Sequence, residues 1–385
     1  MIPYSTQEID QDDIDAVTDT LKSNWLTQGP KVSQFEKILS KKCESKYCIT
    51  FNSATSALHA ACSSFDLGPG DNVWTSANTF AATANVVLLC GAKIDFLDID
   101  PETLNIDVNI LEDKLKNASI SGTLPKLLIT VHFSGESCDM KSIHELSLKY
   151  GFKILEDASH ALGATYNSKP IGSCEFSSMT VFSFHPVKMI TTGEGGCVTT
   201  NSKIIEEKVR DFGRHGITKE KERFSVIQNL DWYYEQQSLG YNYRMNELSA
   251  SLGISQLSKL NYFVKTRNDL AENYNKILPK QIIIPKRNNF NTCSYHLYPI
   301  LLPDKPNLKR DNLFLHLRKL NFGVQVHYIP VYHHPYYRNN GFKDYFLNNT
   351  ENYFKRCLSL PLFPSLKKGD QKQVSSAIES FLKTY

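Results

Sequence analysis

A single lysine stands where a reactive amine could be held on a rigid loop. Lys188 follows a short apolar run, residues 180–184, and Pro186, and it precedes the glycine-rich run 193–196. The apolar run is typical of a buried strand, and the proline and glycines end that strand in a tight loop. We therefore expect Lys188 to project from a strand end, where its amine could do covalent chemistry. A lone loop lysine is more often a solvated surface charge, so the hypothesis needs support from the rest of the chain.

Asp157 is the second candidate, because it ends a β-rich stretch at residues 152–157. In doubly wound sheets ligands bind beyond the carboxyl ends of the strands, so a carboxylate there usually faces a ligand. Such a carboxylate suits pyridoxal phosphate, because it keeps the pyridine nitrogen protonated and lets the ring accept electrons from a carbanion. The alternative is that Asp157 caps a following helix.

Small hydroxyl residues follow another strand pattern, at residues 47–51, and lead into a helical run. Free N–H groups at a helix start carry partial positive charge and accept a dianionic phosphate. Ser53, Thr55 and Ser56 could add hydroxyl donors to such a site. An ordinary Ser/Thr helix cap fits the same residues equally well.

A polar and aromatic stretch, residues 240–247, precedes a helical pattern that begins at Leu248. Asn242 and Arg244 lie before this helix, so they need not face its core side. They are either functional residues or solvated loop residues.

Taken in this order, the segments resemble the nucleotide-sugar aminotransferases of the DegT/DnrJ/StrS family, a branch of the fold-type I pyridoxal-phosphate enzymes. The resemblance covers nearly the whole chain, from residues 26–30 through 78–85 to 358–364. It implies transfer of an amino group from L-glutamate to C4 of a UDP-linked 4-keto sugar. It also implies a homodimer with shared active sites.

The resemblance assigns roles to individual residues around the cofactor. Lys188 matches the catalytic lysine that binds pyridoxal phosphate covalently, and Asp157 matches the partner of the pyridine nitrogen. The matching cofactor-binding residues are Thr55, Ser56, Phe80, Asp157, His160, Ser183, Lys188 and Asn242. His160 stands where relatives often have Gln, which leaves its role open.

The candidates for substrate binding are His185, Arg244, His327 and Tyr328. Asn242 and Arg244 match residues that reach across a dimer interface, the first towards the phosphate and the second towards the amino-acid carboxylate. His327 and Tyr328 belong to a matching segment of the small domain that closes over the sugar in relatives. His185 either polarises substrate oxygens or packs beside the cofactor.

The composition excludes several classes of protein. Lys and Arg number 43 against 40 Asp and Glu, a net charge of +3, so nothing favours nucleic acid as a partner. The nine cysteines form no C-x-x-C pair, which argues against zinc and a disulfide framework and fits a reducing cytoplasm. Adjacent His333 and His334 cannot share one helical face, so we expect no metal site. No apolar run approaches the ~18 residues of a membrane-spanning helix.

The alternation of strand and helix signals predicts an α/β fold. By the resemblance this is a fold-type I aminotransferase, with a large, mostly parallel sheet between helices and a smaller α+β C-terminal domain. We expect an N-terminal helical arm at 1–23, a large cofactor-binding domain at 24–255 and a small domain at 256–385. The predicted flanking elements are helices at 7–22, 245–274, 309–320 and 370–382, with strands at 295–302 and 324–328.

An alternative from another class is a pyridoxal-phosphate-dependent regulator, which would bind the cofactor without turnover. Such regulators carry an added DNA-binding domain, whereas this chain begins almost directly with the enzyme pattern. We therefore expect an enzyme. Amination of another UDP- or dTDP-linked 4-keto-6-deoxy sugar stays open within the enzymes.

Overall fold

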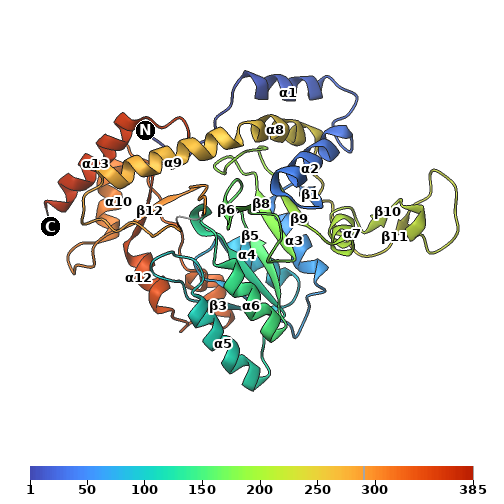
Figure 1. Ribbon diagram of the computed structural model, residues 1–385, viewed down its shortest axis with the longest axis horizontal. Coiled ribbons are helices and arrows are strands. Elements are labelled where there is room, and N and C mark those ends of the chain that lie inside the picture. Colours follow the sequence, from blue (N-terminus) through green and yellow to red (C-terminus); the bar gives the residue numbers. More distant parts are fainter. Residues whose placement is uncertain (289–290, 385) are drawn as a thin grey trace.

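A seven-stranded sheet forms the centre of this computed structural model, which describes residues 1–288 and 291–384 (Figure 1). In order across the sheet the strands are β1 (Tyr47–Phe51), β9 (Gly196–Thr200), β8 (Met179–Ser183), β5 (Lys153–Asp157), β4 (Leu127–Val131), β2 (Asn72–Ser76) and β3 (Lys93–Leu97). Every neighbouring pair from β8 to β3 is parallel, whereas β9 runs antiparallel to both β1 and β8. The expected mostly parallel sheet is therefore confirmed.

Helices cover both faces of this sheet. The core on one face includes residues of α3 (Ala54–Ser64), α4 (Ala81–Leu89) and α7 (Lys203–Phe212). The core on the other includes residues of α2 (Pro30–Cys43), α5 (Val108–Ser121) and α6 (Met140–Tyr150). Alternate strand residues enter the two cores, as Leu155 and Ile154 of β5 do. Strands covered on both faces need apolar side chains on both, which explains their continuous apolar runs.

The N-terminal helix lies along the start of the long helical region (Figure 1). The helix predicted at 7–22 is α1 (Gln11–Leu21), and it begins later because Asp10 forms a capping box with Asp13. The region predicted as one helix at 245–274 forms two, α8 (Glu247–Ser258) and α9 (Leu260–Ile277). The buried Asp13 carboxylate accepts hydrogen bonds at their junction, from Gln256 Nε2 at 2.7 Å and Lys259 Nζ at 2.6 Å.

The C-terminal elements share a core of their own. They include β12 (Tyr298–Leu301), β13 (Cys357–Leu360), α10 (Arg310–Lys319) and α13 (Lys368–Leu382), whereas Tyr353 of α12 (Asn348–Arg356) packs in a smaller cluster with Phe133 and Leu297. The strand predicted at 324–328 is wrong, because this segment makes only one isolated bridge, Gln325 to Ser359. Two backbone groups of this segment bond instead to side chains. The Tyr353 hydroxyl donates to the His327 carbonyl, and the Asn78 side chain accepts from the Tyr328 N–H.

Six short elements lie in the body of the described chain. They are β6 (Thr165–Tyr166), β7 (Lys169–Pro170), η1 (Phe133–Gly135), η3 (Val331–His333), α11 (Pro335–Tyr337) and η4 (Arg338–Phe342). His333 at the end of η3 pairs with Glu351 at 2.7 Å. No group of three or more potential ligands in the described residues could hold a metal ion. Among those residues, too, no helix combines the length and the apolar character needed to cross a membrane.

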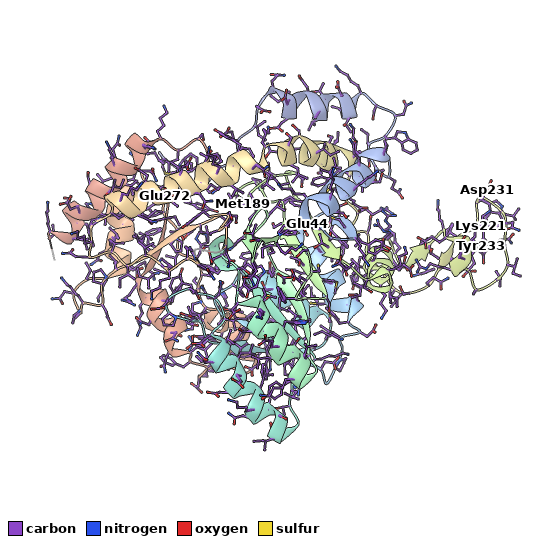
Figure 2. All side chains as sticks on the ribbon, in the orientation of Figure 1. Glu44, Met189, Lys221, Asp231, Tyr233 and Glu272 are labelled. Carbon is purple, nitrogen blue, oxygen red and sulfur yellow. The ribbon has the colours of Figure 1, made fainter. Side chains whose placement is uncertain are left out.

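An arm projects from the body beyond α7 and carries Lys221, Asp231 and Tyr233 (Figure 2). It contains β10 (Ile217–Thr218), η2 (Lys221–Arg223) and β11 (Glu235–Gln236). Its apolar side chains are largely exposed: Val226, Ile227, Leu230, Trp232 and Tyr234. A cluster of exposed apolar side chains of this kind marks an interaction surface.

Candidate active site

Lys188 lies on a closed loop that joins β8 to β9. Two backbone hydrogen bonds of Phe184 close the loop. The Phe184 N–H donates to the Gly195 carbonyl, and the Phe184 carbonyl accepts from the Thr192 N–H. Gly193 has a φ of +78°, so glycine permits the sharp turn that the sequence predicted. Burial lowers the pKa of Lys188 to about 8, although the charge of Asp157 acts in the opposite direction. The amine is therefore partly neutral near pH 7, as a nucleophile or base must be.

Asp157 is the last residue of β5, and its carboxylate is only 5% exposed. One oxygen accepts from Thr83 Oγ1 at 2.7 Å, and the other accepts from the N–H and the hydroxyl of Ser159 at 3.1 and 2.6 Å. It caps a turn, and no helix begins in the residues that follow it, so the helix-cap alternative is wrong. No ion pair among the described residues neutralises this carboxylate. A buried charge without a partner is costly, so the position favours a cationic ligand group.

The hydroxyl segment after β1 is both a helix cap and a possible anion site. The Ser53 hydroxyl accepts from the Ser56 N–H at 3.0 Å, and the Ser56 hydroxyl donates to Asn52 at 2.7 Å. The N–H groups of Ala54 and Thr55, the first two helical residues, find no acceptor in the described part of the chain. These N–H groups and the exposed Thr55 side chain can therefore meet a phosphate.

Gly196 brings β9 against this segment. A Cβ at Gly196 would lie 2.6 Å from the Ala54 nitrogen, so only glycine fits there. Gly196 pairs with both Phe51 of β1 and Ser183 of β8. The Ser183 hydroxyl is buried at the end of β8, next to the start of the Lys188 loop. The segment that could hold a phosphate and the strand that carries Lys188 are thus fixed to each other.

A set of aromatic side chains, from His160, Tyr328, Phe80 and His327, lies next to these residues. His160 Nδ1 accepts from the Ser134 N–H at 3.2 Å, so its Nε2 carries the hydrogen and donates to Tyr328 Oη at 3.0 Å. The Tyr328 ring is 6.2 Å from that of Phe80, which is the N-cap residue of α4 and is 63% exposed. His327 is buried and bonded through Nδ1 to Ser359 at 2.9 Å. Burial lowers the pKa of His327 to about 3, so the ring is neutral.

Two of the predicted residues do not join Lys188 and Asp157 within one chain. Asn242 and Arg244 form bridges to Arg214 and Phe51, on the other side of the hydroxyl segment. No contact in the described residues links either of them to Lys188. His185 is exposed at the start of the Lys188 loop.

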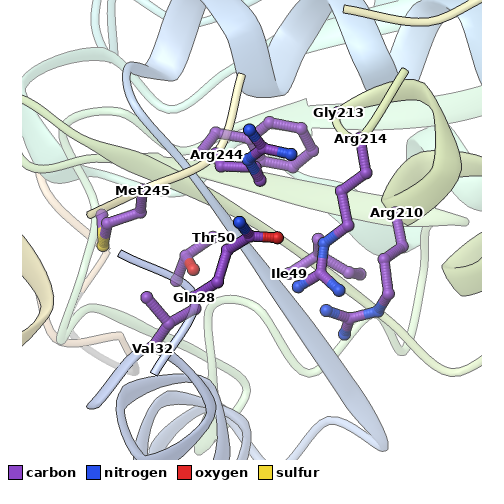
Figure 3. Close-up of a pocket in the computed structure, with 10 residues that line it drawn as sticks. Gln28, Val32, Ile49, Thr50, Arg210, Gly213, Arg214, Arg244 and Met245 are labelled. Atoms are coloured by element: carbon purple, nitrogen blue, oxygen red, sulfur yellow. The ribbon is translucent and has the colours of Figure 1, made fainter. Parts of the chain in front are cut away.

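Arg244 lines a pocket with Gln28, Arg210 and Arg214 (Figure 3). Arg210 is neutralised by Glu206 and by Glu36, whose Oε2 lies 3.1 Å from its Nη1. Within the described residues, Arg214 and Arg244 pair with no carboxylate. The pocket therefore carries positive charge that an anionic group could neutralise.

Comparison with known proteins agrees with this geometry. The model of the DegT/DnrJ/EryC1/StrS aminotransferase family matches residues 7–379. The chain belongs to this family. It is therefore a pyridoxal-phosphate-dependent aminotransferase. The buried carboxylate of Asp157, the neutral fraction of the Lys188 amine and the open start of α3 fit that cofactor.

Three relatives span almost all of the aminotransferase chain. The spore coat polysaccharide biosynthesis protein SpsC of Bacillus subtilis is 39% identical over 388 residues, with 99% of this chain and 97% of SpsC covered. The UDP-4-amino-4,6-dideoxy-N-acetyl-β-L-altrosamine transaminase of Campylobacter jejuni is 39% identical over 386 residues, with 99% and 98% covered. The solved structure of Helicobacter pylori PseC, an aminotransferase of pseudaminic acid biosynthesis, matches with a TM-score of 0.91, 31% identity and full coverage of both chains.

The sequence did not single out three residues that the fold brings to this aminotransferase site. Thr83 and Ser159 bind the Asp157 carboxylate, and His296 Nε2 lies 3.4 Å from Lys188 Nζ. Thr83 lies inside segment 78–85, which carried the family resemblance, but the types and spacing of the three residues alone suggest no role. The signal for Thr83 was its place at the start of a helix after a strand, where a short hydroxyl can face the sheet edge.

Proposed function

We propose that this chain transfers the amino group of L-glutamate to C4 of UDP-2-acetamido-2,6-dideoxy-β-L-arabino-hex-4-ulose. The product would be UDP-4-amino-4,6-dideoxy-N-acetyl-β-L-altrosamine, for pseudaminic acid biosynthesis. Similarity to the C. jejuni transaminase and to PseC supports this substrate. The observation that carries the proposal is that Lys188, Asp157 and the start of α3 meet at one edge of the sheet, where α/β folds bind ligands.

The residues at this edge would hold pyridoxal phosphate from both ends. Asp157 would accept a hydrogen bond from the ring nitrogen, while Thr55 and Ser56 with the first turn of α3 would bind the phosphate. Ser183 would add a hydroxyl beside the phosphate, and Phe80 would stack on the ring. When bound, the cofactor supplies an electron sink for negative charge that develops on the substrate carbon.

Lys188 would move the proton in both half-reactions. The amine of glutamate would replace Lys188 on the cofactor. The neutral amine of Lys188 would then remove the α-proton of glutamate. With the keto sugar the order is reversed, so Lys188 would deliver a proton to one face of C4. A positioned proton transfer of this kind contributes about 10²–10⁴-fold to the rate.

Asn242 and Arg244 would act in the site of a second chain. The structure keeps them away from the Lys188 of their own chain, and the Arg244 pocket carries charge without a partner carboxylate. The arm exposes Ile227 at 99% and Trp232 at 71%, as expected of a surface that another chain covers. A homodimer would therefore bring Asn242 to the phosphate and Arg244 to the donor carboxylate.

The small domain would recognise the sugar. His327 and Tyr328 lie where it meets the cofactor end of the sheet, and His160 would orient the Tyr328 hydroxyl towards the ligand. The division into an arm at 1–23, a large domain at 24–255 and a small domain at 256–385 is part of this proposal. The separate core of β12, β13 and α13 supports it, while α9 packs in both cores.

We place the reaction in the cytoplasm. All nine cysteines are free thiols, and eight of them are buried. Free thiols persist in a reducing compartment, where the nucleotide sugar and glutamate would also be available.

The test is mass spectrometry of the product formed from each candidate UDP-4-keto sugar with L-glutamate. We expect a higher kcat/KM for the β-L-arabino sugar than for its D-xylo epimer. The epimers differ in where the C5 methyl points, and a methyl-sized misfit discriminates by about 1–3 kcal/mol. A higher value for the D-xylo sugar would assign the chain to another nucleotide sugar.

That second candidate has its own support. A UDP-4-amino-4-deoxy-L-arabinose–oxoglutarate aminotransferase of Shewanella sediminis is 32% identical to this chain over 392 residues, which cover 99% of this chain. A regulator without turnover is disfavoured, because Lys188 and Asp157 are present in a geometry that supports catalysis.

A further inference from the structure

His296 faces the reactive amine directly. Its Nε2 lies 3.4 Å from Lys188 Nζ, and no other hydrogen-bond partner of that amine is found among the described residues. The His296 side chain is buried, and its ring centroid is 4.4 Å from that of His160. Its second nitrogen, Nδ1, is buried without a hydrogen-bond partner in the same set of residues. The ring therefore has one clear polar contact, and that contact is Lys188.

The backbone of His296 is held from the small-domain side. Arg267 is 1% exposed and donates through Nη1 to the carbonyls of Tyr295 at 3.2 Å, His296 at 3.4 Å and Leu362 at 2.7 Å. On the other flank, the Leu297 N–H donates to the Ser134 carbonyl at 3.5 Å. Both neighbours of His296 are thus bonded, which fixes the backbone that carries the ring.

The charges around the pair decide which group carries a proton. Four groups surround the His296 ring. They are Lys188 on the β8–β9 loop, His160 in the turn after β5, Arg267 on α9 and His327 in the C-terminal part of the chain. Burial, followed by the positive charge of Lys188, lowers the pKa of His296 well below its usual value. Among the described residues, the carboxylate that acts on Lys188 is that of Asp157 at the end of β5, and it favours the ammonium. A shared proton therefore resides on Lys188, and His296 is the acceptor.

We propose that His296 is the positioning residue for Lys188, holding its amine through an N–H···Nε2 hydrogen bond while the amine moves the substrate proton. This inference rests on the proposed function. The Lys188 amine takes the proton from the donor carbon and becomes an ammonium, which donates to His296 Nε2. Lys188 returns to the neutral amine when it gives up the same proton. The His296 ring stays neutral throughout. A contact of 3.4 Å is long for a hydrogen bond, and such contacts tighten when the charge forms.

Two substitutions separate positioning from packing. His296→Phe keeps an aromatic ring beside His160 and removes the acceptor, whereas His296→Gln keeps an acceptor oxygen near the position of Nε2. The first experiment uses cofactor-free protein: Lys188 is labelled with acetic anhydride across pH, and its extent of reaction is followed by peptide mass. In wild type we expect a midpoint near the pKa of about 8. In His296→Phe the midpoint should fall by about one pH unit, because the ammonium loses its acceptor.

The second experiment measures one turnover of the loaded enzyme with L-glutamate and with Cα-deuterated L-glutamate. His296→Phe should slow the turnover on the order of 10- to 100-fold and raise the isotope effect, since proton transfer becomes more limiting. His296→Gln should restore most of the rate and the labelling midpoint. Equal melting temperatures for the three proteins establish that each is folded.

An unchanged labelling midpoint in folded His296→Phe would overturn the proposal, as would equal loss of rate in the Phe and Gln variants. Neither measurement contains a nucleotide sugar. A wild-type enzyme that passes both tests yet aminates no UDP-4-keto sugar would therefore refute the proposed substrate and leave the role of His296 intact.

Discussion

Replacing Asp157 by Asn tests the cofactor site most sharply, because it removes charge and little else. The amide can keep the observed contacts: its oxygen accepts from Ser159, and its NH₂ donates to Thr83 Oγ1. The Thr83 hydroxyl can then turn to Thr79 Oγ1, which lies 2.8 Å away. The local structure should therefore survive, while the buried negative charge that would face the pyridine nitrogen is lost.

The expected size follows from one charge-assisted hydrogen bond in a buried site. Such a bond contributes about 1.5–3 kcal/mol, so cofactor affinity should fall about 10- to 150-fold. The turnover of glutamate should also slow at saturating cofactor, because an unprotonated ring accepts electrons less well. The substitution should not weaken the folding of the cofactor-free protein. Its stability should hold or rise in Asp157→Asn, since an unpaired buried carboxylate is costly.

The assay is single-turnover absorbance with L-glutamate, together with thermal unfolding of the cofactor-free and loaded forms. Asp139→Asn is the matched control, because it removes a carboxylate that caps α6 away from the Lys188 loop. Wild-type affinity and turnover in Asp157→Asn would refute the assigned role. A loss of stability in the cofactor-free protein would instead show that the carboxylate acts as a structural group.

Three other predictions follow from the same geometry. Inactive Lys188→Ala and inactive Arg244→Ala chains should regain activity when mixed, because one site of each heterodimer would combine intact residues from both chains; proven heterodimers without activity would count against a shared site. Gly196→Ala should weaken cofactor binding measured by titration, since its Cβ would lie 2.6 Å from the Ala54 nitrogen, whereas Gly369→Ala has open space and should bind normally. In cofactor-free protein, Lys188 binds its proton with a pKa near 8 when folded and near 10.5 when unfolded, so it makes stability rise between those pH values. The difference between wild type and Lys188→Met in urea unfolding at several pH values should show this slope, and parallel profiles would exclude a lowered pKa.

The parts of the site that sequence could predict are those fixed by local pattern. Asp157 ends one short apolar strand and Lys188 follows another, and parallel strands place their carboxyl ends on one edge. Ser53 could be assigned two roles because a helix cap and an anion site use the same N–H groups, and the structure is consistent with both. The strand predicted at 324–328 failed because its backbone groups bind side chains that lie far away in sequence.

His296 could not be predicted from the sequence for a different reason, because long-range packing brings it to Lys188 from 108 positions away. Long-range packing also leaves three features unsatisfied within one chain. Within the described residues, Asp157 is buried with no ion-pair partner, Arg244 lines its pocket with no partner carboxylate, and the arm exposes apolar side chains. Each carries a free-energy cost that a different partner would relieve: the ring nitrogen of the cofactor, an anionic donor and a second chain. We propose that binding and association relieve these costs together, so cofactor loss should weaken the proposed dimer as well as the activity.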